Sequence, residues 1–390
     1  MRVLYVIDSL ARGGAETSLV HIAPAYRDLG IELHVAFLRD RGDLGPALVE
    51  AGASLHPVAL HRARPRQLLA LVRLIRLLRP DLIHTTLWEA DVLGRGAASL
   101  TRTPAVSTLP TSRAGASADA NPGVPPVKLR LARGVDVVTA RLVARFHAVS
   151  ETVADEMAGS LHVRRDRIEV IPRARRRDVL GEPSASRRSA ARRALGLDDD
   201  RPMILAVGRH EHQKGLDVLV AAIPEIRAAV PDAVVLVAGH PGRVTAALHE
   251  AIDANDLRDV VTLLGTRNDV PDLLVAADAV AVPSRFEGMP GAVLEAMALA
   301  RPVVATDLPT VREAIDGCAF ELVPVDDAGA LARALVRCLG DPAAADRALE
   351  SRRRFDELFT PRPVAERMRD LYRNVLDRTS PSRTSGPAVP

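Results

Sequence analysis

The chain opens on an apolar run, and similar runs recur along it at intervals filled by amphipathic segments. Arg2–Ile7 is almost continuously apolar, which is typical of a parallel-sheet strand covered on both faces. Ser18–Leu29 then carries apolar residues at helical spacing. The alternation continues with predicted strands and helices at Leu33–Leu38, Leu44–Ala51, Leu55–Val58, Arg66–Leu78, Asp81–His84, Pro104–Thr108, Phe146–Ser150 and Ile168–Ile171. Repeated strand–helix units predict a doubly wound parallel sheet.

The same pattern restarts at the strand Met203–Val207, so a second domain of the same α/β class is expected. From Arg173 to Asp200 the composition becomes rich in Arg, Ser, Ala and Asp, which is typical of a linker. The predicted organisation is a first domain at 1–178, a linker at 179–200, a second domain at 201–358, a final amphipathic helix at 359–378 and a disordered Ser/Pro/Gly-rich tail at 379–390.

Pro283–Ala298, with the sequence PSRFEGMPGAVLEAMA, follows the predicted strand Ala279–Val282 and becomes a helix. Pro290 suits a first helical turn, and a helix N-terminus favours an anion. Glu287 on the loop and Glu295 in the helix flank this turn, which suits a ligand that carries phosphates and hydroxyls. From spacing alone, both glutamates could equally be solvated or cap the helix.

Two cations lie on another loop that follows a strand. Arg209 and Lys214 come between Met203–Val207 and a helix that starts at Leu216. A guanidinium and an ammonium ahead of a helix are well suited to a diphosphate, although a solvated basic loop is the alternative for Arg209. Gly13 and Gly14 follow the first strand, where they allow a ligand to approach or simply form a tight turn.

Polar residues at the end of Asp81–His84 are candidates for ligand binding, because ligands bind at the carboxyl ends of such strands. They are His84, Trp88 and Glu89. A lone histidine at a strand end is more often a structural hydrogen-bonding group. The Ser-, Gly-, Ala- and Pro-rich segment 111–126 is expected to form a mobile loop.

The motif EGMPxxxLEAMAxxxPVVAT, with seven residues between its glutamates, resembles the sugar-nucleotide motif of the retaining glycosyltransferases of family 4. GRxxxxKG resembles that family's diphosphate loop, and GGAET its N-terminal donor loop. The resemblance implies a GT-B fold: two Rossmann-like domains that face each other across a cleft, with a final helix that crosses back to the first domain. It covers most of the chain.

The resemblance also implies roles for individual residues, and it makes His84, Trp88 and Glu89 acceptor-side candidates and 111–126 an acceptor lid. Arg209 and Lys214 would bind the diphosphate, Glu287 the sugar hydroxyls and Glu295 the ribose, which makes Arg209, Lys214 and Glu287 the catalytic candidates. Further donor-binding candidates are Gly13, Gly14, Gly239, Thr266, Arg267, Gly288, Met289 and Gly291. The loop 266–269 would hold the base through backbone groups. The chain departs from the family at 109–112, where a sugar-contacting histidine is lacking, and at Pro172–Ala174, where an Asn-Gly turn is usual.

The composition limits the classes of binding partner and the cellular compartments that are expected. The net charge is only +3, Lys128 and Lys214 are the only lysines, and no basic–aromatic motif indicates nucleic acid. Two cysteines without metal or redox spacing fit a reducing cytoplasm. The first apolar run is too short for a signal peptide, and no run reaches the ~20 residues of a membrane span. The arginine-rich segment His61–Pro80 leaves a peripheral contact at the inner membrane face open, although a sheet-covering helix with an arginine outer face is favoured.

The expected activity is therefore transfer of a sugar from a UDP- or GDP-linked donor to a glycan, lipid-linked or small-molecule acceptor, without metal or cofactor. The only acidic run, Asp198–Asp200, follows no strand, which disfavours a metal-dependent transferase. Another GT-B enzyme, such as a sugar-nucleotide epimerase or a phosphorylase, is one alternative. A non-catalytic nucleotide-sugar-binding subunit is another, and the missing histidine favours it.

Overall fold

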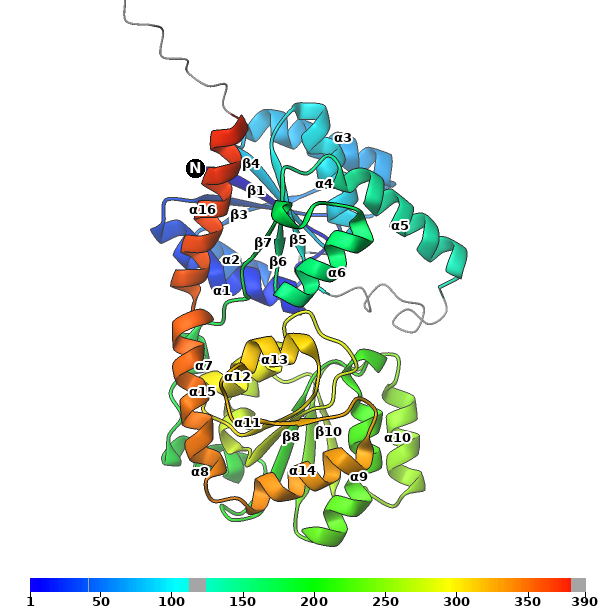
Figure 1. Ribbon diagram of the computed structural model, residues 1–390, viewed down its shortest axis with the longest axis vertical. Helices are drawn as coiled ribbons and strands as arrows, with labels where there is room; N and C mark the ends of the chain where they lie inside the picture. The colour runs from blue at the N-terminus through cyan, green and yellow to red at the C-terminus, as the bar shows by residue number, and fades with distance from the viewer. Residues whose placement is uncertain (41, 112–123, 380–390) are drawn as a thin grey trace, which may run out of the picture.

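The computed structural model describes residues 1–40, 42–111 and 124–379 of the chain. Figure 1 shows two α/β domains one above the other, with helix α16 (Pro361–Thr379) running along one side of the upper domain. Most of the expected acceptor lid and nearly all of the expected disordered tail lie outside the described residues. No helix in the described ranges is long and apolar enough to cross a membrane.

The N-terminal domain contains a sheet of seven parallel strands in the order β3-β2-β1-β4-β5-β6-β7. Its strands are β1 (Arg2–Ile7), β2 (Glu32–Phe37), β3 (Ser54–Pro57), β4 (Leu82–Thr86), β5 (Ala105–Leu109), β6 (Arg145–Ala148) and β7 (Ile168–Val170). Its helices are α1 (Gly14–Asp28), α2 (Gly45–Glu50), α3 (Arg64–Leu78), α4 (Trp88–Thr101), α5 (Pro126–Ala140) and α6 (Glu151–Leu161). Strand β1 is buried because helices cover both faces, and the strand order reverses beside it, where ligands bind in such sheets.

The C-terminal domain repeats this topology with six parallel strands in the order β10-β9-β8-β11-β12-β13. The strands are β8 (Met203–Val207), β9 (Val234–Ala238), β10 (Val261–Gly265), β11 (Ala279–Val282), β12 (Val303–Thr306) and β13 (Glu321–Val323). The helices are α9 (Leu216–Ala229), α10 (Thr245–Ala254), α11 (Val270–Ala276), α12 (Gly291–Ala298), α13 (Pro309–Ile315), α14 (Ala328–Gly340) and α15 (Ala344–Leu358). The expected α/β class with two doubly wound parallel sheets is confirmed.

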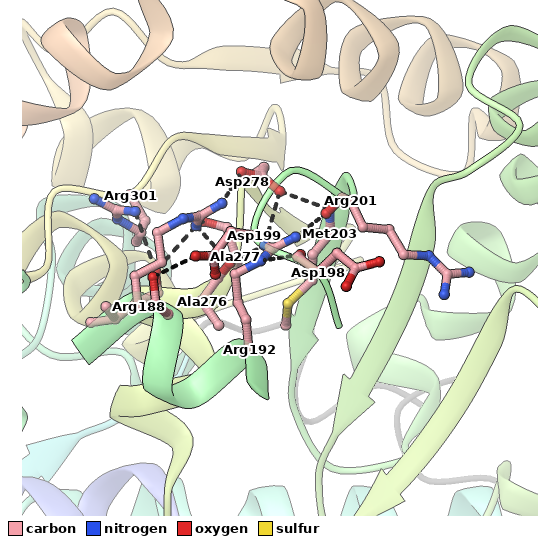
Figure 2. Close-up of polar contacts among 12 residues, drawn as sticks. Arg188, Arg192, Asp198, Asp199, Arg201, Met203, Ala276, Ala277, Asp278 and Arg301 are labelled. Atoms are coloured by element: carbon pink, nitrogen blue, oxygen red, sulfur yellow. Dashed lines mark hydrogen bonds and ion pairs between the residues drawn. The ribbon is translucent and has the colours of Figure 1, made fainter. Parts of the chain in front are cut away.

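The segment expected to be a linker contains two helices, α7 (Arg177–Leu180) and α8 (Ala185–Ala194), and α8 packs on the C-terminal domain. Figure 2 shows why its arginines are structural. Arg188 donates to the carbonyl oxygen of Ala276 at 2.6 Å and to Asp278 at 2.5 Å. Arg192 is fully buried and donates to the same carbonyl at 2.8 Å. These guanidiniums satisfy carbonyl groups left open at the end of α11, where the helix dipole favours cations.

The final helix returns to the N-terminal domain. Met368, Leu371 and Tyr372 of α16 are buried in the same apolar cluster as residues of β1 and α1. The hydroxyl of Tyr372 lies 3.3 Å from that of Tyr26 on α1. Helix α16 therefore closes the first core and, through α15, ties the two domains together.

Candidate active site

The two catalytic candidates with the clearest geometry contact each other. Lys214 Nζ lies 2.5 Å from Glu287 Oε1, although 73 residues separate them in the chain. Lys214 ends the loop after β8, and Glu287 lies on the loop between β11 and α12. Ser284 Oγ also donates to Glu287 Oε1 at 2.8 Å, and the Glu287 side chain is only 6% exposed. An ammonium and a carboxylate are thus held side by side at the carboxyl edge of the second sheet.

Two glycines allow backbone segments to pack closely at this edge of the second sheet. Gly215 has a φ of +58°, and a Cβ there would lie 2.0 Å from the carbonyl oxygen of Pro283. Gly288 has the same role between domains, because its Cβ would lie 2.2 Å from the carbonyl oxygen of Pro110 on the loop after β5. The N-terminal domain therefore touches the turn that leads into α12, and a side chain at Gly288 would separate the two domains.

Glu295 lies one turn into α12 and contacts an arginine that the sequence did not single out. Arg175 Nε donates to Glu295 Oε1 at 2.8 Å, and Arg175 Nη1 donates to Ser18 Oγ of α1 at 3.0 Å. The Arg175 side chain is 3% exposed and that of Glu295 19%. Arg175 thus joins α1 to α12 across the cleft, and it fixes one oxygen of the carboxylate that was expected to bind ribose.

A second unexpected arginine lies against the Gly13–Gly14 turn. A Cβ at Gly14 would lie 2.4 Å from Arg173 Nη1. Arg173 Nη2 donates to the Pro110 carbonyl at 2.9 Å, and burial lowers the pKa of Arg173 to about 10, so it remains a cation at neutral pH. Its charge acts on both Glu16 and Glu287. Burial raises the pKa of Glu16, which lies in the first turn of α1.

Arg209 is exposed and faces the same cleft from the C-terminal domain, because its charge acts on Glu16 of α1. Across the described residues, Arg209 makes no salt bridge, in contrast to Lys214. Gly239 lies at the end of β9, where its Cβ would be 1.8 Å from the Gly208 carbonyl oxygen. These residues place one free guanidinium beside a tightly packed strand edge.

The remaining donor-side candidates occupy the rim and base of the same edge. Arg267 donates to Asp269 at 2.8 Å, so this arginine is already paired beside Thr266. Met289 is 5% exposed in the turn before α12. Gly291 begins α12, where a Cβ would lie 2.6 Å from Arg175 Nη2. The start of α12 thus lies against the Arg175 guanidinium.

His84 is buried, and both of its ring nitrogens have hydrogen-bond partners. Its Nδ1 lies 2.5 Å from the Tyr372 hydroxyl and its Nε2 lies 2.6 Å from Thr108 Oγ1. Thr108 contacts His147, whose Nε2 lies 2.8 Å from the Ile171 carbonyl oxygen. Burial lowers the pKa of His84 well below its ordinary value, so the imidazole is neutral. This network lines a small cavity of about 50 Å³ that Arg173 also borders.

Trp88 and Glu89 begin α4 close to the end of β1. Glu89 accepts from Arg39 and from Arg64, both at 3.0 Å. Burial would raise the pKa of Glu89, but the hydrogen bonds from Arg64 and Arg39 lower it below its ordinary value. The Arg64 guanidinium lies 5.2 Å from the centre of the Trp88 ring, and the buried Trp88 Nε1 has no hydrogen-bond partner within the described structure.

Asp8, which follows β1, lies beside the start of α4 and was not predicted as a site residue. Its carboxylate accepts from the backbone N–H of Ala90 at 2.7 Å, and burial raises its pKa to about 6. Over the described ranges, no group of three or more His, Cys, Asp or Glu side chains could hold a metal ion.

Two Rossmann-like domains with parallel sheets form the GT-B fold of glycosyltransferases. Residues 12–176 match the family model described as Glycosyltransferase Family 4, and residues 201–341 match that of Glycosyl transferases group 1. A D-inositol 3-phosphate glycosyltransferase of Xylanimonas cellulosilytica is 30% identical over 96% of this chain and 91% of that protein. The chain belongs to glycosyltransferase family 4, as its motifs predicted, and it is an enzyme of the glycosyltransferase class.

Other relatives differ in the reactions that their names give. The alpha-D-kanosaminyltransferase of Streptomyces kanamyceticus is 30% identical over 58% of this chain and 57% of that protein. A UDP-Gal:alpha-D-GlcNAc-diphosphoundecaprenol alpha-1,3-galactosyltransferase of Escherichia coli is 26% identical over 79% of each. The crystal structure of Anabaena HepE with UDP-glucose has a TM-score of 0.83 and 22% identity, with 96% of this chain and 100% of that chain covered, which shows the shared fold.

Proposed function

We propose that this enzyme transfers a sugar from a UDP- or GDP-linked donor to a hydroxyl acceptor with retention of anomeric configuration and without a metal ion. The observation that carries the proposal is the contact of Lys214 with Glu287 beside the start of α12. In this geometry a cation for the diphosphate and a carboxylate for the sugar hydroxyls lie next to each other. The HepE complexes with UDP and UDP-glucose and the UDP-Gal-dependent relative support a nucleotide-sugar donor.

The donor diphosphate would lie between the Arg209 guanidinium, the Lys214 ammonium and the N–H groups at the start of α12. Negative charge develops on the diphosphate as the anomeric C–O bond breaks, and preorganised cations stabilise it there. Arg173 adds a third positive charge from the other side of the cleft. These three side chains, rather than a metal ion, would neutralise the leaving group in this proposal.

Retention would follow from attack on the same face that the leaving group leaves. The acceptor oxygen forms a bond to the anomeric carbon, the bond from that carbon to the diphosphate oxygen breaks, and the acceptor proton passes to the departing diphosphate. Glu287 would hold the sugar by its hydroxyls, and Glu295, with one oxygen fixed by Arg175, would hold the ribose diol. The family's strand-end histidine has no counterpart at Leu109–Thr111, and Arg173 borders that position instead through the Pro110 carbonyl.

The acceptor would enter beside Asp8, Trp88 and Glu89. The arginines that flank Glu89 suit an acceptor with hydroxyl and anionic groups. A glycan, a lipid-linked sugar and a small molecule all meet this description. A cytoplasmic location belongs to the proposal as well, because the two free cysteines fit a reducing compartment.

A thermal-shift screen with UDP, GDP, ADP and dTDP tests the donor class. A ligand present at about 100 times its Kd stabilises a protein by roughly 2.7 kcal/mol, so the ranking identifies the base. Addition of the matching nucleotide sugar should then release nucleoside diphosphate only when an acceptor is present. Conversion of the nucleotide sugar to another nucleotide sugar, without release of nucleoside diphosphate, would contradict the transfer reaction and favour an epimerase.

A further inference from the structure

Helix α5 carries an apolar stripe that faces solvent. Val127, Leu131, Val135 and Val138 are 63%, 65%, 41% and 61% exposed. At 3.6 residues per turn these positions lie within an arc of about 80° on one side of the helix. Leu142, just beyond the helix, is 44% exposed. A soluble helix normally buries such a stripe, so its position on the outer side requires another explanation.

The inner side of α5 packs against the rest of the N-terminal domain. Arg95 of α4 is fully buried, and its Nη1 lies 2.5 Å from Asp136 Oδ1, which is the only acidic side chain of α5. Ala140 is also buried. Helix α5 is therefore anchored by one face to α4, and in the view of Figure 1 it extends from the side of the domain opposite α16. The apolar stripe is the face left over.

Basic residues border the stripe on both sides. Lys128 follows one edge of the arc, and Arg130 and Arg141 follow the other, with Arg133 further round. All four basic side chains are exposed, and Arg141 lies just after the end of the helix. The one carboxylate of α5 points inward to Arg95. The outer face thus presents apolar side chains between positive charges, without a negative charge from α5 itself.

Helix α3, which the sequence singled out for a membrane contact, differs. Its exposed large aliphatic residues are Leu69 and Leu77, at 50% and 79%, and Arg73 lies between them on the same face. The apolar residues Leu71, Val72 and Ile75 point into the core. Helix α3 therefore covers the sheet with an arginine outer face, whereas α5 offers a continuous apolar stripe.

We propose that α5 docks this enzyme on the surface of an anionic lipid bilayer, with the stripe in the interfacial layer and the basic residues on lipid headgroups. Charge selects this occupant over a second copy of the chain, because two α5 stripes packed together would bring like charges face to face. An interfacial helix of this kind binds through buried apolar area plus attraction to anionic lipid. Each Lys or Arg near such a surface is worth about fivefold in partition.

Flotation of the full chain with vesicles tests the proposal, with pure phosphatidylcholine vesicles compared with equal parts of phosphatidylcholine and phosphatidylglycerol. Wild-type protein should partition at least tenfold more strongly into the anionic vesicles, and added salt should weaken this partition. Leu131→Gln/Val138→Gln and Arg130→Gln/Arg141→Gln should each lower it tenfold or more. The matched control on α3, Leu69→Gln/Leu77→Gln, should stay within about twofold of wild type.

Melting temperatures of all variants are measured alongside, and nucleotide-induced stabilisation should be unchanged, which separates loss of docking from loss of fold or of transferase function. Equal partition of wild type and the α5 variants would overturn the proposal. So would light scattering that shows a wild-type dimer converted to monomer by Leu131→Gln/Val138→Gln, with no preference for anionic vesicles, since a second copy would then cover the stripe.

Discussion

Arg175 Nε lies 2.8 Å from Glu295 Oε1, and this ion pair connects the segment between the domains to the helix that begins at the proposed diphosphate site. The same guanidinium reaches Ser18 on α1. Both charged side chains are largely shielded from solvent, so their interaction is weakly screened. The pair thus links the orientation of the carboxylate proposed to bind the ribose to the contact between the domains.

Replacement of Glu295 by Ala should weaken binding of the preferred nucleoside diphosphate by about 10- to 100-fold, because hydrogen bonds to a charged group contribute roughly 1.5–3 kcal/mol. Calorimetric titration measures this directly. Unchanged affinity would show that Glu295 does not bind the ribose.

Arg175→Ala isolates the positioning role of the arginine. If Arg175 acts by orienting Glu295, the double variant Arg175→Ala/Glu295→Ala should bind nucleotide no more weakly than Glu295→Ala alone. Additive losses would instead indicate that Arg175 contacts the nucleotide independently of Glu295.

Lys214→Ala should lower kcat by about 10²–10³-fold, the loss typical of one preorganised donor at a developing negative charge. It also leaves the buried Glu287 carboxylate without its cation, so stability should fall. The double variant Lys214→Met/Glu287→Gln should recover stability without activity, and Arg227→Ala on the surface of α9 serves as an activity control. Near-normal turnover of Lys214→Ala would remove Lys214 from the diphosphate site.

Gly288→Ala should reduce turnover while the domains remain folded, because its methyl group would meet the Pro110 carbonyl oxygen at 2.2 Å and force the cleft open. Gly159→Ala on α6 is the matched control, since a Cβ there meets nothing within 4 Å. Small-angle scattering should show a larger radius of gyration for Gly288→Ala alone. If both variants were equally active and compact, the contact between Gly288 and the loop after β5 would have no role in closure.

The repeating strand–helix pattern predicted most elements because their apolar runs are local properties of the chain. Arg2–Ile7, Met203–Val207 and Ala279–Val282 have the bounds expected from the sequence. The segment 179–200 is different, because α8 consists mainly of arginine, serine and alanine and is held by arginines bonded to the end of α11. Such bonds depend on a partner far along the chain, so composition alone indicated a linker.

In the candidate site, too, local motifs indicated some residues, whereas others are recognised only by their contacts with distant parts of the chain. Lys214 and Glu287 follow different strands, and parallel topology brings them together as their motifs indicated. Arg173 and Arg175 were missed because they lie in a run of arginines after β7 that resembles a solvated segment. The sequence indicated this only through the departure from the usual Asn-Gly turn at Pro172–Ala174, because side chains there can make contacts that a glycine turn cannot.

The buried histidine network predicts a pH effect on stability. Burial lowers the pKa of His147 to about 4, whereas an unfolded imidazole has a pKa near 6.5. Between these values the unfolded chain binds a proton that the folded protein does not, so this residue reduces stability as the pH falls. His147→Gln should gain about 2 kcal/mol relative to wild type when the pH is lowered from 7.5 to 5. Denaturant melts at both pH values measure the difference, and a pH-independent difference would contradict a neutral buried imidazole.

The most direct test of the whole account is a crystal structure of the protein with the nucleoside diphosphate that ranks first in the thermal-shift screen. The account predicts phosphate oxygens about 2.7–3.2 Å from Lys214 Nζ and from the Arg209 guanidinium, beside the N–H groups at the start of α12. A nucleotide bound elsewhere, or a diphosphate that touches neither cation, would contradict the proposed transferase mechanism.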